Sequence, residues 1–180
     1  MFRYLDSTAF AAMDETRTKK LFKQLVEALI YAAKRGVSHR DLKLENLIFL
    51  NPGTESEKLV IIDWGLAAVD NEFKQSERWV GSPDYVAPEV LLHRAYQPEK
   101  ADVWSLGVLL FIFLTGKLPY NKKTRFAMLR NGQHPSVVFP AEALKRLSGD
   151  ARDIIEKCLT FDTNERHDLN GLLNHPWLNC

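Results

Sequence analysis

The stretch His39-Arg40-Asp41-Leu42-Lys43-Leu44-Glu45-Asn46 lies between an amphipathic helical pattern and a short apolar run. It offers a carboxylate at Asp41, an ammonium at Lys43 and an amide at Asn46. A carboxylate can accept a hydroxyl proton, a lysine can neutralise a phosphoryl group in transfer, and an amide oxygen is a good magnesium ligand. Asp63, which follows the next apolar run, supplies a second oxygen for magnesium. Together these residues predict a site for phosphoryl transfer.

Each of these polar residues also has a local interpretation. Asp and Asn in loops usually hydrogen-bond to nearby backbone and stabilise turns. Gly65, two residues after Asp63, is expected to take a positive φ in a sharp turn. Only the combination of residues therefore favours chemistry over turn formation.

The sequence on either side of this stretch predicts regular elements. Residues 14–35 repeat apolar side chains at three- and four-residue steps, which predicts a helix that Gly36 ends. Residues 47–50 and 59–62 are short apolar runs joined by a polar loop, which is typical of a β-hairpin.

The remainder of the chain is predicted to be mostly helical. Residues 63–88 show no sustained period, and a loop of this length is uncommon unless it is functional. Residues 102–115 are apolar on nearly every side, which predicts a fully buried helix ending at Gly116. Ser148 and Asp168 are expected N-caps. Shorter helical patterns cover residues 122–131, 148–160 and 167–174. The fold class predicted is mainly α with a small β-hairpin.

Composition narrows the class of protein further. The chain has 180 residues, of which 46% are hydrophobic and 26% charged, with a net charge of +1. This balance predicts a globular protein without nucleic acid or a membrane as a partner. Two cysteines, Cys158 and Cys180, cannot form a disulfide framework or a zinc cage, and Cys158 is expected to be buried. The absence of a secretory signal and of a long apolar run predicts an intracellular location, cytoplasmic or nuclear.

Three motifs in order carry a resemblance to a known family. Residues 39–46, then Asp63-Trp64-Gly65, then Ala87-Pro88-Glu89 resemble the signature set of protein kinases. The match continues through residues 102–107 and Arg166, so it covers essentially the whole chain.

The resemblance implies a fold and a subclass. Residues 1–180 are identified as a partial protein kinase domain, namely the helical C-terminal lobe with its small hairpin. The catalytic loop would be residues 39–46 and the activation segment residues 63–89. Lys43 and the sequence 81–85 resemble those of Ser/Thr kinases, in particular the calmodulin-dependent and AMP-activated group.

The resemblance also implies roles in binding ATP and Mg²⁺. Asp41 would be the catalytic base, and Lys43 would contact the γ-phosphate. Asn46 and Asp63 would hold magnesium, and Ile48 would form part of the ATP site.

Two further residues are expected near a protein substrate with a Ser or Thr acceptor. Ser82 would hydrogen-bond near Asp41 and Lys43 and favour a hydroxyl substrate. Glu45, at the edge of the ATP site, matches a position that meets a substrate arginine in basophilic kinases. Its alternative interpretation is an exposed loop acid without a partner.

Four matched residues are expected to be structural. His39 would pack beneath the site, and Asp102 would accept hydrogen bonds from the catalytic-loop backbone. Glu89 and Arg166 would form an ion pair between distant segments.

Regulation is expected to differ from that of the related enzymes. Arg78 replaces the Thr that they often phosphorylate, so a phosphate on Ser76 or the carboxylate of Glu77 would have to pair with Arg40. Trp64 replaces the usual Phe beside His39.

Part of the family pattern is missing from this sequence. It contains no Gly-x-Gly-x-x-Gly motif and no Val-Ala-x-Lys strand, which cover and anchor the ATP phosphates. The N-terminal lobe is therefore absent from the chain, and upstream sequence or a separate lobe is an expected partner. Alone, the chain is expected to bind Mg·ATP weakly. The alternatives are a pseudokinase-like scaffold fragment and a truncated product without function.

Overall fold

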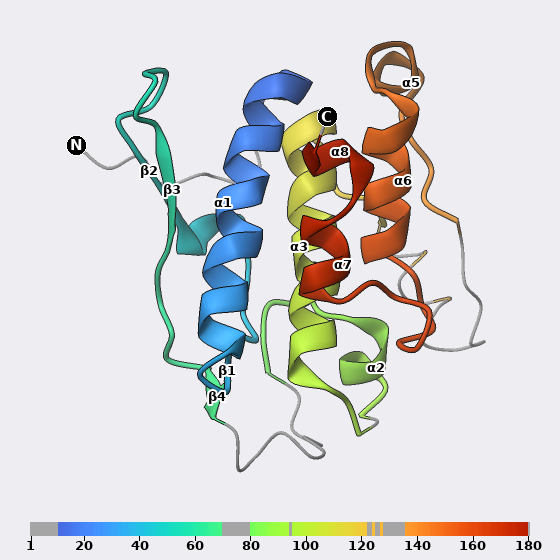
Figure 1. Ribbon diagram of the computed structural model, residues 1–180. Coiled ribbons are helices and arrows are strands. Elements are labelled where there is room, and N and C mark those ends of the chain that lie inside the picture. Colours follow the sequence, from blue (N-terminus) through green and yellow to red (C-terminus); the bar gives the residue numbers. More distant parts are fainter. Residues whose placement is uncertain are drawn as a thin grey trace.

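The structure is a computed structural model that describes residues 11–69, 80–93, 95–121, 124, 127 and 136–179. Figure 1 shows α1, α3 and α6 side by side, with the β2–β3 hairpin flanking α1 and with α7 and α8 lying over α3. The elements are α1 (Glu15–Ala33), β1 (Val37–Ser38), the 3₁₀ helix η1 (Leu44–Asn46), β2 (Leu47–Leu50), β3 (Lys58–Ile61), β4 (Ala68–Val69), α2 (Pro88–Leu91), α3 (Pro98–Thr115), α5 (Ala141–Arg146), α6 (Gly149–Cys158), α7 (Leu169–Leu173) and α8 (Pro176–Asn179).

Helix α3 forms the centre of the core. Every residue from Ala101 to Leu114 is buried, as the apolar pattern predicted. The helix begins at Pro98, four residues before the predicted start, because proline at the first helical position has the required φ and needs no hydrogen-bond partner for its nitrogen. It ends at Gly116, whose φ of 70° lies in the left-handed region.

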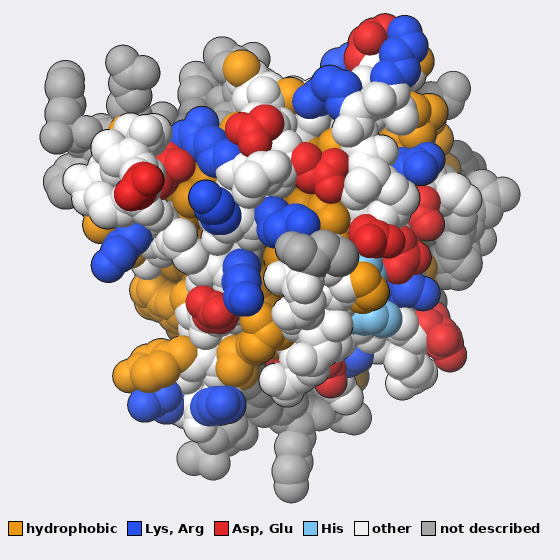
Figure 2. Space-filling view, turned by 45° about the horizontal axis from the view of Figure 1, so that its top comes forward, with side chains coloured by type: hydrophobic (Ala, Val, Ile, Leu, Met, Phe, Trp, Pro, Cys, Tyr) orange, Lys and Arg blue, Asp and Glu red, His pale blue; other side chains and the backbone are white. Residues whose placement is uncertain are grey.

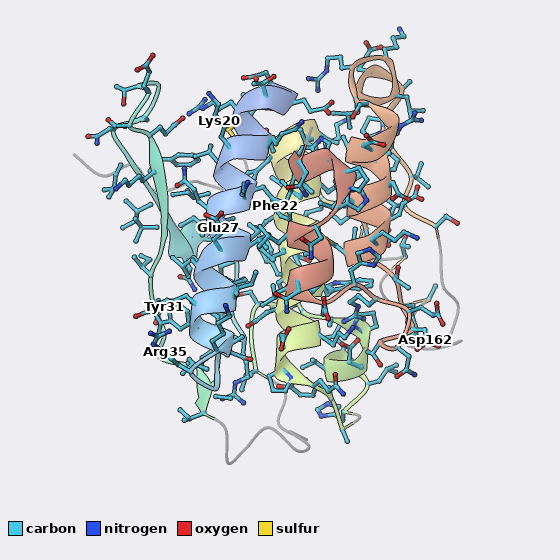
Figure 3. The ribbon with its side chains drawn as sticks, viewed as in Figure 1. Lys20, Phe22, Glu27, Tyr31, Arg35 and Asp162 are labelled. Carbon is cyan, nitrogen blue, oxygen red and sulfur yellow. The ribbon has the colours of Figure 1, made fainter. Side chains whose placement is uncertain are left out.

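Helix α1 packs one face against the core and leaves the other in solvent. Asp14 caps its N-terminus by accepting from the Arg17 backbone N–H at 2.8 Å. On the buried face, the Phe22 ring meets the Trp177 ring of α8 edge to face at 6.0 Å between centroids (Figure 3). Helical hydrogen bonding stops at Ala33, two residues before the predicted end.

Two short antiparallel sheets lie beside α1. Strands β2 and β3 pair with Leu47 opposite Ile61, so the predicted hairpin is confirmed, with its second strand one residue earlier than predicted. Strands β1 and β4 pair Val37 with Val69. This second pair was not predicted, because two-residue strands are too short to show a period.

The shorter helices agree only partly with the sequence patterns. Ser148 and Asp168 cap α6 and α7, accepting from the backbone N–H groups of Ala151 and Gly171. Both helices are shorter at each end than predicted. Helices α2, α5 and α8 were missed because they contain only four to six residues. The helix predicted at 122–131 falls mostly outside the described residues.

Cys158 is fully buried in α6, as expected, and burial raises the pKa of its thiol. No helix in the described part of the chain is both long and apolar enough to cross a membrane.

The hairpin is tied to α1 by a paired set of charges. Arg17 donates from Nε and Nη2 to the two carboxylate oxygens of Glu57, at 3.0 and 2.6 Å. Gln24 adds two bonds to the same loop, donating to the Glu57 carbonyl at 3.2 Å and accepting from the Leu59 N–H at 2.9 Å. These contacts hold the hairpin, and with it the loop that precedes β2, against the first helix.

The Arg17–Glu57 pair predicts a dependence of stability on pH. The hydrogen bonds from Arg17 lower the pKa of Glu57 below its usual value near 4.5. The folded state therefore binds fewer protons than the unfolded state, so the stability due to this pair is complete above pH 4.5 and is lost as pH falls through the lowered pKa. In Glu57→Gln the melting temperature should decline less between pH 5 and pH 3 than in the wild type. Glu55→Gln, an exposed acid in the same loop, should leave the wild-type slope unchanged.

Candidate active site

The catalytic-loop segment begins on a buried carboxylate from α3. Asp102 accepts from the backbone N–H of His39 at 2.7 Å and from that of Arg40 at 2.8 Å. Arg40 has a φ of 66°, which turns the chain sharply between β1 and the loop. Burial raises the pKa of Asp102 to about 7, although the two N–H donors act in the opposite direction. Both hydrogen bonds expected from the sequence are present, and they fix the start of the loop to the core helix.

His39 lies beneath the site with both ring nitrogens engaged. Its Nδ1 accepts from the Asp41 backbone N–H at 3.2 Å, so the proton of the neutral ring is on Nε2, which faces the Ile62 carbonyl at 3.1 Å. Burial is the main cause of the lowered pKa of His39. A neutral imidazole that is committed on both sides can orient Asp41 but is not free to transfer protons.

Three side chains converge directly above this histidine. Lys43 Nζ donates to Asp41 Oδ2 at 2.7 Å and to Ser82 Oγ at 3.0 Å, and Ser82 Oγ donates to Asp41 Oδ1 at 3.0 Å. Asp41 is buried, with 7% of its surface exposed. The closed triangle holds the carboxylate in one orientation with a cation beside it.

Gly81 allows the Ser82 segment to approach this closely. Its φ is 104°, and a Cβ atom there would lie 2.7 Å from the Arg40 carbonyl oxygen and 2.8 Å from a Val86 methyl group. Any side chain would push Ser82 away from Asp41. Sequence reasoning treated Gly81 as a break in the pattern, and its place immediately before Ser82 was the available signal.

Asn46 and Asp63 are brought to the same end of the β2–β3 hairpin. The Ile62 N–H donates to the Asn46 carbonyl at 2.9 Å, which extends the pairing by one residue and places Asp63 next in the chain. Asn46 Nδ2 donates to the Asp41 carbonyl at 2.9 Å, which turns the amide oxygen away from that contact. The expected positive φ at Gly65 is wrong. Asp63 itself adopts it, at 61°, while its Oδ1 accepts from the Gly65 N–H at 3.3 Å.

The donor set of these two residues fits a magnesium ion. The carboxylate of Asp63 is exposed, and no described group donates to the amide oxygen of Asn46. Both are the hard oxygen ligands that magnesium prefers, and magnesium sites commonly use one or two protein oxygens together with substrate phosphates.

Other predicted residues lie farther from this network. Glu45 is exposed in η1, and no contact printed by the geometry joins it to Asp41. Ile48 is half-buried on β2, opposite the exposed Val60 of β3. Trp64 is 38% exposed, and its ring meets the His39 ring edge to face at 4.6 Å.

The Arg40 guanidinium is directed toward the segment before β4. It donates from Nε to the Leu66 carbonyl at 2.7 Å and from Nη2 to the Ala67 carbonyl at 3.4 Å. Its expected partners, Ser76 and Glu77, lie outside the described residues.

A buried ion pair supports the floor of the site. Arg166 donates from Nη1 and Nη2 to the two carboxylate oxygens of Glu89, at 2.7 and 2.9 Å. Its remaining N–H groups go to the carbonyls of Thr160, Lys100 and Phe161, so all five donors are used. The pair joins α2, at the end of the Ser82 segment, to the loop before α7.

Comparisons with known proteins agree with this geometry. The family model for the protein kinase domain matches residues 1–178. The chain is 35% identical over 168 residues to calcium-dependent protein kinase 5 of Plasmodium falciparum, covering 93% of this chain and 29% of that protein. It is 37% identical over 169 residues to CBL-interacting serine/threonine-protein kinase 5 of Arabidopsis thaliana, covering 92% and 36%. It is 33% identical over 178 residues to human serine/threonine-protein kinase H1, covering 98% and 41%. The chain thus spans less than half the length of each of these relatives.

Proposed function

Because the chain belongs to the protein kinase family, we propose that it provides the catalytic loop for ATP-dependent phosphoryl transfer to serine or threonine in protein substrates. The observation that carries this proposal is the triangle of Asp41, Lys43 and Ser82, in which a buried carboxylate is held in one orientation beside a cation.

The side chains of the triangle divide the reaction between them. The substrate hydroxyl oxygen attacks the γ-phosphorus of ATP, and its bond to phosphorus forms as the bond from the γ-phosphorus to the bridging oxygen breaks and ADP leaves. Asp41 accepts the hydroxyl proton. Lys43 stabilises the negative charge on the phosphoryl oxygens, and Asn46 and Asp63 offer oxygens to magnesium, which would neutralise the phosphates.

Ser82 holds the base and the lysine in register, which gives a testable prediction. Ser82→Ala removes the hydrogen bonds to both neighbours, and we expect transfer to fall about tenfold, the effect of one hydrogen bond worth about 1 kcal/mol. Ser82→Thr keeps the hydroxyl and should retain most of the activity. Equal rates for the Ala and Thr variants would show that the hydroxyl does not contribute.

The proposed function is tested by joining this chain to the ATP-binding lobe of one of the relatives. The fusion, supplied with Mg·ATP, should phosphorylate basic peptides with a Ser or Thr acceptor and leave the matching Tyr peptide unmodified. The relative's own catalytic domain is the positive control. An inactive fusion that melts cooperatively and still binds the Ser peptide would contradict the proposal and indicate a binding fragment.

A further inference from the structure

We propose that Ser148 is a phosphorylation site for a serine/threonine kinase that selects basic residues before its acceptor, and that the phosphate loosens α1 from the C-terminal helices. The inference rests on the surroundings of Ser148 and is independent of the activity proposed above.

Ser148 combines accessibility with a basic sequence. It is exposed, and Lys145 and Arg146 stand three and two residues before it, the positions at which basophilic kinases read positive charge. Figure 2 shows basic and acidic side chains together on the projecting corner that α5 forms in Figure 1. Ser38 also follows two basic residues but is only 2% exposed. Among the Ser and Thr residues in the described ranges, no other is exposed with basic residues at both positions.

The backbone around Ser148 is already suited to a kinase groove. Leu147 has φ −85° and ψ 135°, and Ser148 has φ −62° and ψ 162°, so both are extended. Only the end of α5, a helix of six residues, must open. Arg146 holds that end by a hydrogen bond from Nη2 to the Leu114 carbonyl at 2.9 Å. Short elements of this kind open locally at low cost.

The hydroxyl of Ser148 is also part of a junction between the two ends of the chain. Ser148 Oγ donates to Glu15 Oε1 at 2.6 Å, and the Ser148 N–H donates to Glu15 Oε2 at 3.0 Å. Trp177 Nε1 donates to the same Glu15 Oε1 at 2.8 Å. Burial acts to raise the pKa of Glu15, but the bonds from Ser148 and Trp177 outweigh it and leave the pKa lowered. Glu15 is therefore ionised at neutral pH and ties α1 to α6 and α8.

Phosphorylation would break this junction. Ser148 Oγ attacks the γ-phosphorus of ATP, the bond to the bridging oxygen breaks, ADP leaves, and the hydroxyl proton passes to the base of the modifying kinase. The product places roughly two negative charges beside the Glu15 carboxylate. The phosphate can still cap α6 at the Ala151 N–H, which is 3.1 Å from Ser148 Oγ. Repulsion from Glu15 is larger, because Trp177, only 1% exposed, also loses its acceptor.

The first test uses the full chain, Mg·ATP and a purified kinase that requires basic residues three and two positions before its acceptor. Mass spectrometry should locate phosphate on Ser148, and the melting temperature of the modified chain should fall by about 4 °C. Lys145→Ala/Arg146→Ala should prevent modification. Lys20→Ala/Lys117→Ala, which removes two exposed charges elsewhere, should not. A second arm with Mg·ATP alone asks whether another copy of this chain is the modifying kinase. No phosphate on Ser148, while a free Lys-Arg-Leu-Ser peptide is fully modified, would overturn the proposal.

A second test separates the added charge from the loss of the helix cap. Ser148→Asp and Ser148→Asn both cap helices well, but only the first adds charge beside Glu15. The Asp variant should melt about 4 °C below the Asn variant. The difference should disappear when Glu15→Gln is combined with each. Equal melting temperatures in the wild-type background would show that charge at Ser148 does not act on α1.

Discussion

Replacing Asp41 with asparagine is expected to lower phosphoryl transfer by about 10³-fold, because a positioned general base contributes about 10² to 10⁴. An amide of the same size can still accept from Ser82 and Lys43, whose atoms lie 3.0 and 2.7 Å from the carboxylate oxygens. It cannot take the substrate proton. The loss should therefore appear in kcat, with the KM for ATP nearly unchanged.

The assay compares this variant with two others in the fusion protein described above. Glu55→Gln removes an exposed carboxylate far from the triangle and should have wild-type kcat. Asp63→Asn should instead raise the magnesium concentration needed for half-maximal rate. A fall in kcat of less than tenfold for Asp41→Asn, in a variant that melts like the wild type, would remove Asp41 as the base.

Replacing Arg166 with alanine is expected to destabilise the fold by about 3–5 kcal/mol, the cost of leaving one partner of a buried ion pair uncompensated. Glu89 is 7% exposed and would remain as an unpaired charge. Three backbone carbonyls would lose their donor at the same time. For a chain of this size, the melting temperature should fall by about 10 °C.

Three variants test the cause of this loss. Arg166→Lys keeps the charge but not the planar fork that serves Glu89 and the carbonyls, so it should be intermediate. Arg166→Met with Glu89→Leu removes both charges and should recover part of the stability lost in Arg166→Ala. Arg35→Ala, which removes an exposed cation, should cost less than about 1 kcal/mol. If Arg35→Ala and Arg166→Ala were equally stable, the ion pair would be shown to contribute nothing.

The parts of the site that lie close together in the chain were predictable. Asp41, Lys43 and Asn46 are within six residues, so their spacing alone suggested phosphoryl transfer. The buried helix around residues 102–115 was also clear, because an element enclosed on every side must be apolar on every side.

Local pattern was insufficient where two conformations were both compatible with the sequence. Gly65 was the expected positive-φ residue after β3, yet Asp63 takes that conformation, since Asp tolerates it and its side chain bonds to the Gly65 N–H. The β1–β4 pair and helices α2, α5 and α8 were invisible because none is long enough to repeat a period.

The sequence by itself thus determined the chemical groups of the site and the class of the fold, because both are recorded in short-range spacing and periodicity. Only the tertiary structure decided how distant residues meet. Ser82 reaches Asp41 across 41 positions because Gly81 leaves room for it, and Ser148 reaches Glu15 across 133 positions through the packing of α1 against α6 and α8. Such contacts depend on how helices pack in three dimensions, for which spacing along the chain carries no signal.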